Sequence, residues 1–378
     1  MSPEPLPATP GHSALHDWLH IGGLGGALLL GAGTWAAVPP ALEAAAGLSV
    51  VDGAWTAAFE DKLDAEAPHR ALALPLWGAI EFFAFGDGRD GVVLAQDGLL
   101  FTDEELRLYP NEAQNTAESL RLILKARELL AQKNVQLVVA LLPAKVRLHQ
   151  GQLRTPWAPQ AEARYAHALG ALQAAGVVAP DLHAALAAKQ AQGVEVFLRT
   201  DTHWTPAGAQ AVAEELAAEI KARGLLPSAG GATYSRTDGP EEPHEGDLLK
   251  YLPLGPLAHR GPAPDRLRPP TFALTSGGGG GGLLDEVSVP VALVGTSYSH
   301  NPRFGFAGAL QVALGADVLN AAQEGKGPIT PMARYLGDAS LRESPPQVVI
   351  WEIPERYLPR ADELATLPPP LGDEEPAR

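Results

Sequence analysis

The sequence predicts an α/β fold in which a mostly parallel sheet is flanked by helices on both faces. From residue 111 onward, short apolar runs alternate with segments whose apolar residues recur at helical spacing. One run, Val135–Leu142, is apolar along nearly its whole length, which is typical of a strand covered on both faces. Helices between successive strands favour parallel pairing, because each crossover returns the chain to the same end of the sheet.

Residues 46–110 precede this alternation, and we predict that they form a lead-in packed on the main domain. Helical patterns cover Ala54–Ala65 and Ala71–Phe83. The lead-in ends in G-V-V-L-A-Q-D-G-L-L-F, where two short apolar runs flank an Asp-Gly pair. That arrangement predicts a β-hairpin.

The main domain is predicted to span residues 111–360, followed by a loose, acidic and proline-rich tail over residues 361–378. Residues 224–286 are rich in proline and glycine, and the glycine run Gly277–Gly282 is typical of a flexible surface linker. The predicted helices are Asn115–Lys133, Pro159–Ala175, Leu182–Gln192 and Pro206–Arg223. The predicted strands are Val135–Leu142, Val177–Val178, Val194–Leu198, Val289–Gly295, Ala316–Ala321 and Gln347–Ile353.

Residues 1–45 contain an uncharged apolar segment, Leu19–Val38, in which only His20 can take up a proton. Its length of about 20 residues suffices to cross a hydrocarbon core of about 30 Å, so we interpret it as a membrane anchor helix. A cleaved signal peptide and a Gly/Ala-rich helix buried in the protein remain open. No Lys or Arg precedes Lys62, so the positive-inside rule gives no orientation.

The composition excludes some classes of function. A formal net charge of −16 argues against a nucleic-acid partner, because binding to phosphates needs a basic surface. The chain has no cysteine, which removes disulfides, thiolate catalysis and cysteine metal sites together. A polyanionic ligand held by a local cluster of Arg and Lys is still compatible with this composition.

Polar residues follow several predicted strands, at the edge where α/β sheets collect their ligands. Ser297 stands on a Gly-preceded turn that can present its hydroxyl. Asp201 and His203 follow another strand, and at i and i+2 of an extended segment their side chains project to the same side. Gly325 follows a third strand and can bring a backbone N–H close to a ligand.

These residues predict a nucleophilic triad, in which His203 takes the proton of Ser297 and Asp201 fixes the imidazole tautomer. Each feature alone has a common structural explanation. A serine after Gly-Thr is often a helix cap, and an Asp-x-His pair also suits a divalent metal. No third ligand stands at a convincing spacing, so we predict no metal and no cofactor, and the joint placement favours a serine nucleophile.

Four short motifs carry these residues: D-T-H-W-T-P-A-G at 201–208, V-G-T-S-Y-S at 294–299, L-N-A-A-Q-E-G-K-G-P at 319–328 and V-I-W-E-I-P-E-R-Y-L at 349–358. With R-D-G-V-V-L-A-Q-D-G-L-L-F at 89–101, they resemble the alginate O-acetyltransferases of the AlgX and AlgJ type, within the SGNH hydrolase superfamily. The resemblance covers roughly residues 55–360.

The resemblance implies an SGNH-hydrolase-like fold and an O-acetyltransferase that acetylates hydroxyls of an alginate-like exopolysaccharide through an acetyl-serine. On the matching positions Ser297 is the nucleophile, His203 the base and Asp201 its orienter, while the N–H groups of Ser297 and Gly325 form the oxyanion hole. The Asn that SGNH hydrolases usually place in the last block is absent or replaced by Arg356. The Asp/His block precedes the Ser block, as in a circular permutation, which the alginate group shares.

An anionic acceptor needs local cations on so acidic a protein. The resemblance also implies an acetyl donor supplied by a membrane-bound O-acyltransferase, and a place on the periplasmic face of the bacterial inner membrane, or in the periplasm if the helix is cleaved. Two other functions fit the same residues: a carbohydrate acetyl esterase or deacetylase, and a non-catalytic polysaccharide-binding subunit of an export complex. The candidate substrate-binding residues are Arg303, Lys326, Arg334, Lys145 and Arg356, with Tyr298 and Trp204 offering rings to sugars.

Overall fold

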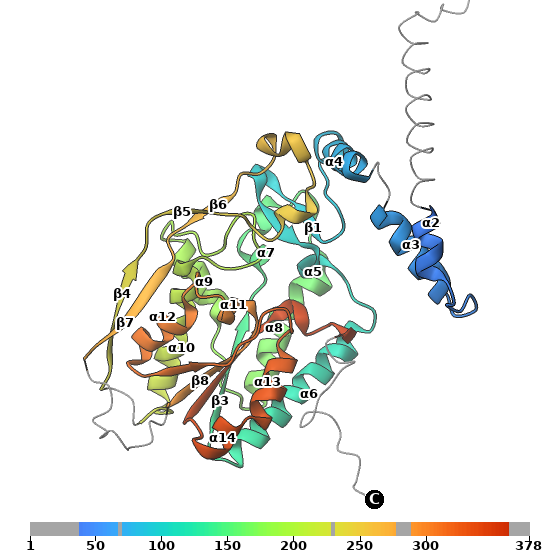
Figure 1. Cartoon of the computed structure of the whole chain (residues 1–378). Coiled ribbons are helices and arrows are strands. Elements are labelled where there is room, and N and C mark those ends of the chain that lie inside the picture. The colour runs from blue at the N-terminus through green and yellow to red at the C-terminus, as the bar shows by residue number, and fades with distance from the viewer. Residues whose placement is uncertain (1–37, 67–69, 228–230, 277–288, 363–378) are drawn as a thin grey trace, which may run out of the picture. The chain divides into compact units, whose positions relative to one another are not determined.

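A parallel four-stranded sheet forms the centre of the larger part of the chain (Figure 1). Its strands lie in the order β3 (Gln136–Leu142), β10 (Val348–Pro354), β8 (Val291–Val294) and β9 (Val318–Asn320). All neighbouring pairs are parallel. Every residue of β8 and β10 is buried, because helices cover both faces of these two central strands. The predicted parallel α/β architecture is confirmed.

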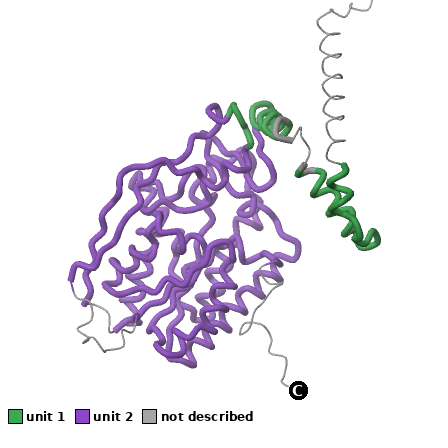
Figure 2. Tube along the Cα trace, in the orientation of Figure 1, with its two compact units in different colours: residues 1–85, 253–257 green, residues 86–252, 258–378 purple. Residues whose placement is uncertain are grey.

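The computed structural model describes residues 38–66, 70–227, 231–276 and 289–362. The chain divides into two units, one of residues 1–85 with 253–257 and one of residues 86–252 with 258–378 (Figure 2). The sheet and every residue of the predicted triad belong to the second unit. Its boundary follows Phe85, so the hairpin that we predicted within the lead-in belongs to the larger unit.

Two hydrophobic cores lie on the two faces of the sheet, because successive residues of a strand point to opposite sides. Val138 and Ala140 of β3 join one core, whereas Val139 and Leu141 join the other. In Figure 1 the helices of the two cores lie on opposite sides of the strands. The first core is covered by α9 (Leu182–Gln190), α10 (Pro206–Ala222) and α12 (Phe306–Leu314), and the second by α6 (Glu112–Ala131), α8 (Pro159–Ala174) and α13 (Ile329–Gly337).

Helix α10 follows the Asp/His motif directly, and its start is fixed by local chemistry. Pro206 occupies the first turn, where its missing N–H is not needed. The Thr205 side chain caps the helix by accepting from the Gly208 N–H at 3.1 Å. The motif is therefore held at one end by a well-defined helix start.

The remaining elements of the larger unit are short. The predicted hairpin is confirmed as the antiparallel pair β1 (Val92–Leu94) and β2 (Leu100–Thr102). The short α-helices are α5 (Asp103–Leu106), α7 (Lys145–Leu148), α11 (Ser297–His300) and α14 (Ala339–Glu343). The 3₁₀ turns of this unit are Gln96–Gly98, Gln150–Gln152, Leu249–Tyr251 and Glu355–Tyr357, and a further turn, Gly255–Arg260, begins in the smaller unit.

Two predicted strands are wrong as members of the sheet. Val194–Leu198 forms only an isolated antiparallel bridge, Phe197 with Trp204, and Val177–Val178 only a bridge to Val138. In the first case the backbone closes on itself, since the Leu198 N–H donates to the His203 carbonyl at 3.0 Å. The segment therefore pairs with its own return and is not part of the four-stranded sheet.

Residues 231–276 carry strands where we predicted none. β4 (Thr233–Asp238) pairs with β7 (Pro270–Ser276), and β5 (Glu242–His244) pairs with β6 (Asp265–Leu267), both antiparallel. The many prolines hid these strands, because proline interrupts the alternating pattern by which strands are recognised. The glycine run Gly277–Gly282 lies outside the described residues.

The smaller unit is helical in its described part. It contains α2 (Val38–Ala45), α3 (Ala54–Glu66), α4 (Arg70–Ile80) and a π-helical turn (Glu81–Phe85), so both predicted helices are confirmed. The predicted anchor Leu19–Val38 lies outside the described residues except for Val38. Within the ranges that the structure describes, no helix combines the length and apolar character needed to span a bilayer.

Candidate active site

Ser297 lies on a tight turn at the carboxyl end of β8, as predicted. The turn needs a glycine at position 295, because a Cβ there would lie 2.5 Å from Oε2 of Glu352. Thr296 caps the short helix α11, which begins at Ser297. The serine is half-buried, so its hydroxyl stands at the surface of the sheet edge rather than in the core.

Glu352 is a buried carboxylate in β10 that stabilises the turn before Ser297 by hydrogen bonds. It accepts hydrogen bonds from the Thr296 N–H at 2.7 Å, the Thr296 hydroxyl at 3.0 Å and the Ser299 hydroxyl at 3.0 Å. Burial raises the pKa of Glu352, although these hydrogen bonds oppose the rise. The sequence analysis did not identify Glu352. An acidic residue inside an otherwise apolar strand was the feature that could have indicated it.

The raised pKa of Glu352 predicts how its contribution to stability depends on pH. Below the ordinary value of 4.5 the carboxyl is protonated in both the folded and the unfolded chain. As the pH rises, the unfolded chain ionises first, so the contribution of Glu352 to stability falls through the interval up to the raised pKa. We therefore expect Glu352→Gln to gain stability relative to the wild type as the pH increases above 4.5.

Urea unfolding of both proteins across a pH series measures this difference. Glu343→Gln, which changes an exposed glutamate at the end of α14, is the matched control and should show no such trend. Parallel stability curves for the Glu352→Gln and wild-type proteins would show that the carboxyl titrates alike in the folded and unfolded chains.

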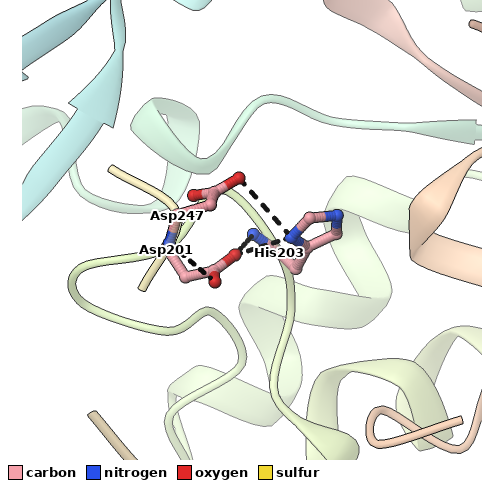
Figure 3. A group of neighbouring side chains, drawn as sticks. All are labelled: Asp201, His203 and Asp247. Carbon is pink, nitrogen blue, oxygen red and sulfur yellow. Dashed lines mark hydrogen bonds and ion pairs between the residues drawn. The ribbon is translucent and has the colours of Figure 1, made fainter. Parts of the chain in front are cut away.

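The structure brings Asp201, His203 and Ser297 together in one line. The His203 Nε2 atom lies 2.7 Å from the Ser297 Oγ, across 94 residues of sequence. The other ring nitrogen, Nδ1, lies 2.6 Å from Oδ1 of Asp201. Figure 3 shows the carboxylate of Asp201 and the imidazole of His203 facing each other. The hydroxyl, imidazole and carboxylate are therefore ordered as a nucleophile, a base and an orienting group require.

The Asp201 and His203 side chains meet by a different route from the one we predicted. The Asp201 carboxylate also accepts from the backbone N–H of His203 at 2.8 Å, which is the contact of an Asx turn. The segment therefore bends instead of running extended. The imidazole is clamped by aromatic rings, with the Phe304 centroid at 5.0 Å and the Tyr298 centroid at 4.6 Å.

Asp201 is ionised and almost fully enclosed. Burial alone would raise its pKa, but hydrogen bonds from His203 and His244 outweigh burial and hold the pKa well below its usual range. The Asp247 N–H donates to Oδ2 at 3.1 Å, and His244 Nε2 lies 2.8 Å from the same oxygen. Both oxygens of Asp201 are thus engaged by two donors each.

A segment that sequence reasoning missed surrounds the backbone of residues 199–203. The Asp265 carboxylate accepts from the N–H groups of Arg199 at 2.7 Å and Thr200 at 2.8 Å. Asp247 accepts from the Thr202 N–H at 2.8 Å and the Thr202 hydroxyl at 2.6 Å. No motif marks these residues, because their role depends on a fold of residues 242–267 that the sequence pattern did not reveal.

Gly246 lets this segment approach residues 199–203 closely. A Cβ at Gly246 would lie 2.1 Å from the carbonyl oxygen of Thr200, which no real contact allows. We call residues 242–252 and 258–267 of the larger unit the cradle, because their side chains and backbone hold the Asp/His turn.

Four of the predicted substrate-binding residues are buried, which contradicts a direct role in binding a polymer. Their exposed fractions are 0% for Trp204, 1% for Lys145, 2% for Tyr298 and 6% for Arg356. Trp204 belongs to the core, and Tyr298 donates its hydroxyl to the Thr202 carbonyl. Arg356 donates to the Tyr298 hydroxyl at 3.2 Å and to Glu104 at 3.1 Å. Its guanidinium is therefore paired within the protein.

The side chain of Lys145 stabilises the Asp/His turn by hydrogen bonds to backbone carbonyls. Its Nζ donates to the carbonyl oxygens of Leu100 at 2.7 Å, Arg199 at 3.0 Å and Asp201 at 3.0 Å. Burial lowers the pKa of Lys145 to about 8, against the attraction of nearby carboxylates such as Glu105. Lys145, which we predicted to contact substrate, instead stabilises the loop that carries Asp201.

The other predicted contacts remain at the surface. Lys326, Arg334 and Gly325 are exposed, and Gly325 has a positive φ of 68°, which favours glycine. The loop that carries Gly325 is tied to the serine turn, since the Gln323 N–H donates to the Gly295 carbonyl at 3.0 Å. Arg303 is only partly free, because it is paired with Glu242 of the cradle at 2.5 Å.

Asp201, His203 and Asp247 also have the donor types of a metal site, and their ligand atoms lie within 4.8 Å of one another. Each donor already has a hydrogen-bonding role, however. His203 Nδ1 faces Asp201, and both oxygens of Asp247 accept from Thr202. A cation here would have to break the line between the carboxylate and the imidazole.

Comparison with known proteins identifies the family. Residues 92–355 match the model described as an SGNH hydrolase-like domain, acetyltransferase AlgX. The chain is 44% identical over 335 residues to the probable alginate O-acetylase AlgJ of Azotobacter vinelandii, covering 86% of each protein. It is 42% identical over 360 residues to the Pseudomonas aeruginosa protein of the same name, covering 92% of this chain and 91% of the relative.

A solved structure agrees with the sequence comparison. The O-acetyltransferase domain of Pseudomonas putida AlgJ superposes with a TM-score of 0.68 at 40% identity, covering 74% of this chain and 96% of that domain. The chain belongs to the family of SGNH hydrolase-like acetyltransferases that includes AlgX and AlgJ.

Proposed function

We propose that this acyltransferase moves acetyl groups onto hydroxyls of an alginate-like exopolysaccharide, with Ser297, His203 and Asp201 as its catalytic triad. The observation that carries the proposal is the unbroken line from the Ser297 hydroxyl through the His203 ring to the Asp201 carboxylate, with contacts of 2.7 and 2.6 Å. The names of the AlgJ relatives supply the acceptor class. In this family the Asp/His block precedes the Ser block, which we interpret as a circular permutation of the SGNH order.

In the first half-reaction the Ser297 Oγ attacks the carbonyl carbon of an acetyl donor, and its proton moves to His203 Nε2. The N–H groups of Ser297 and Gly325 stabilise the oxyanion, each by about 3 kcal/mol. The intermediate collapses when the bond to the leaving group breaks, and the leaving group takes the proton from Nε2. Acetyl-Ser297 remains, while Asp201 keeps the Nδ1 proton in place.

In the second half-reaction a sugar hydroxyl replaces the leaving group. His203 Nε2 accepts the proton of this hydroxyl as its oxygen attacks the acetyl carbon. Collapse returns the proton to the Ser297 Oγ and releases the acetylated sugar. Transfer requires the sugar to outcompete water, which a bound polymer achieves by positioning its hydroxyl next to the acetyl-serine.

An assay with a chromogenic acetyl ester tests the direction of the reaction. In the presence of a mannuronate oligomer, we expect mass spectrometry to detect oligomer that carries acetyl groups. Acetate release that is unaffected by the oligomer, with no acetylated sugar, would instead assign a carbohydrate acetyl esterase that uses the same residues.

We also propose a location and a partner, both of which rest on the family resemblance. We place the enzyme at the periplasmic face of the inner membrane, anchored or exported through Leu19–Val38 and supplied with acetyl groups by a membrane-bound O-acyltransferase. At this location both the polymer and the acetyl group have to cross the membrane before the transfer. Protease protection of the chain in spheroplasts would contradict this location.

The exposed side of the loop after β9 offers a site for the anionic acceptor. A cleft there is lined by residues that include Leu319, Ala322, Gln323, Arg334 and Asp338. One lining residue is bonded to the short helix α11, which begins at Ser297, because His300 Nδ1 lies 3.0 Å from the Ala322 carbonyl oxygen. Arg334 stands on this cleft with one N–H on the Gln323 side-chain oxygen at 2.6 Å, which leaves further donors of its guanidinium for a uronate carboxylate.

We expect Arg334→Ala to raise the KM for a mannuronate oligomer by about 3-fold to 10-fold, since an exposed charge contact contributes roughly 1 kcal/mol. A neutral oligosaccharide should show no change in KM. The matched control is Arg342→Ala, which removes an exposed arginine from α14 outside the cleft. Equal KM increases for the charged and the neutral sugars would rule out recognition of the carboxylate by Arg334.

A further inference from the structure

His244 contacts the acid of the triad from the side opposite to His203. Its Nε2 lies 2.8 Å from Oδ2 of Asp201, while Nδ1 of His203 lies 2.6 Å from Oδ1. Because the carboxylate is ionised and can only accept, the proton between His244 and Asp201 belongs to the imidazole. Two imidazoles therefore donate to one carboxylate, one through each oxygen.

The surroundings of His244 do not explain a histidine by packing alone. The residue is 8% exposed, and its ring meets the Phe304 ring edge to face at 6.0 Å. Its second nitrogen, Nδ1, is buried and has no hydrogen-bond partner among the residues that the structure describes. An unpaired buried nitrogen is unfavourable, so an apolar ring would suit this position better if packing were its purpose.

The position of His244 in the cradle connects the acid to the nucleophile side of the site. On the same strand, β5, Glu242 pairs with Arg303, which follows the serine turn. Gly246 and Asp247 then bring the chain against Thr200 and Asp201. The cradle thus holds His244 on a fixed backbone, at the distance where its bond to Asp201 forms.

We propose that His244 is a positioning residue of the triad, which keeps Asp201 oriented toward His203 and partly neutralises its charge. This inference rests on the proposed role of Ser297, His203 and Asp201. A donor on Oδ2 fixes the rotation of the carboxylate, so Oδ1 stays in line with His203 Nδ1. The same donor withdraws charge from Asp201, which limits how strongly Asp201 stabilises the protonated form of His203.

Removing this donor should change both the rate and its pH dependence. We expect His244→Phe to lower kcat for acylation of Ser297 by a chromogenic acetyl ester about 10-fold to 100-fold, with KM changed less than about 2-fold. The less neutralised Asp201 should hold His203 protonated to higher pH, so the acid limb of kcat/KM should move upward. The His244→Phe variant retains the other charged groups around this site, so they do not account for a shift in the pH profile. These groups are Lys145, Asp247, Asp265, Glu242 and Arg303.

A conservative variant separates positioning from packing. His244→Gln places an amide N–H near the position of Nε2 and should recover most of the rate and the wild-type acid limb, whereas His244→Asn is too short to do so. If His244→Phe does not fold, the comparison of the Gln and Asn variants decides the question alone. Equal activity of these two, or wild-type kinetics in His244→Phe, would overturn the inference.

The control is His149→Phe, which replaces another histidine that buries an unpartnered nitrogen, but one that does not contact Asp201. It should leave the kinetics unchanged. The wild-type and Ser297→Ala proteins are measured in parallel. Absence of acylation in the wild type, or its persistence in Ser297→Ala, would reject the proposed function before any His244 variant is considered.

Discussion

Replacement of Ser297 by alanine is expected to lower kcat for acetyl transfer by about 10⁴-fold to 10⁶-fold. The hydroxyl lies 2.7 Å from the His203 ring nitrogen. In the proposed mechanism it carries the acetyl group, so the variant lacks the atom that would be acetylated. Intact-protein mass spectrometry after exposure to a donor should detect acetyl on the wild type and none on the variant. Ser299→Ala is the matched control, because it removes a buried hydroxyl from the same turn that bonds Glu352 and not His203.

The same experiment tests whether the three residues act as a unit. Combining Ser297→Ala with His203→Ala should cost little more than Ser297→Ala alone, because a base without its nucleophile has nothing to activate. Polymer acetylation that persists in Ser297→Ala would favour the remaining alternative, a non-catalytic polysaccharide-binding subunit.

The motifs led to three residues that the structure brings together, although one supporting strand was wrong. The prediction of Asp201 and His203 required Val194–Leu198 to be a strand that ends at the carboxyl edge of the sheet. The segment instead forms a bridge between Phe197 and Trp204. Hydrogen bonds from Lys145 and to Asp265 hold the residues that follow it. The motif was sufficient because it encodes the Asx turn and the Thr205 cap, both of which depend on neighbouring residues only.

The supporting residues could not be predicted in the same way. His244, Asp247 and Asp265 act on residues more than 40 positions away, through contacts such as Thr202 to Asp247 with a separation of 45. Their segment reads as proline-rich and irregular, so neither strand periodicity nor a motif marks it. Glu352 was detectable in principle, since a single carboxylate in a buried strand needs a partner.

Charge assignments failed for a related reason. Sequence reasoning treats Lys and Arg as exposed, which holds for Lys326 and Arg334. Lys145 and Arg356 are buried because backbone carbonyls and acidic side chains accept their hydrogen bonds, and no local pattern shows those partners. Of the predicted cations, Lys326 and Arg334 therefore remain exposed, and Arg303 is half-buried.

Asp201→Asn is expected to lower kcat by about 10³-fold to 10⁴-fold, because Asp201 receives four donors on two oxygens and an amide can accept on only one. If the amide nitrogen faces His203, the ring must carry its proton on Nε2 and can no longer accept one from Ser297. If it faces His244, His203 keeps its tautomer but loses the negative charge that stabilises its protonated form.

The variant should also lose stability in a way that depends on pH. The pKa of Asp201 is held far below the ordinary value of 3.8, so its ionised form stabilises the fold above that pH and the contribution disappears as the pH falls through the lowered pKa. The difference in unfolding free energy between wild type and Asp201→Asn should therefore be largest near neutrality and shrink in acid. Asp238→Asn, at an exposed carboxylate of β4, should show no comparable loss. A constant difference across the whole pH range would mean that the amide disrupts packing, and that the charge of Asp201 is not what holds the two histidines in place.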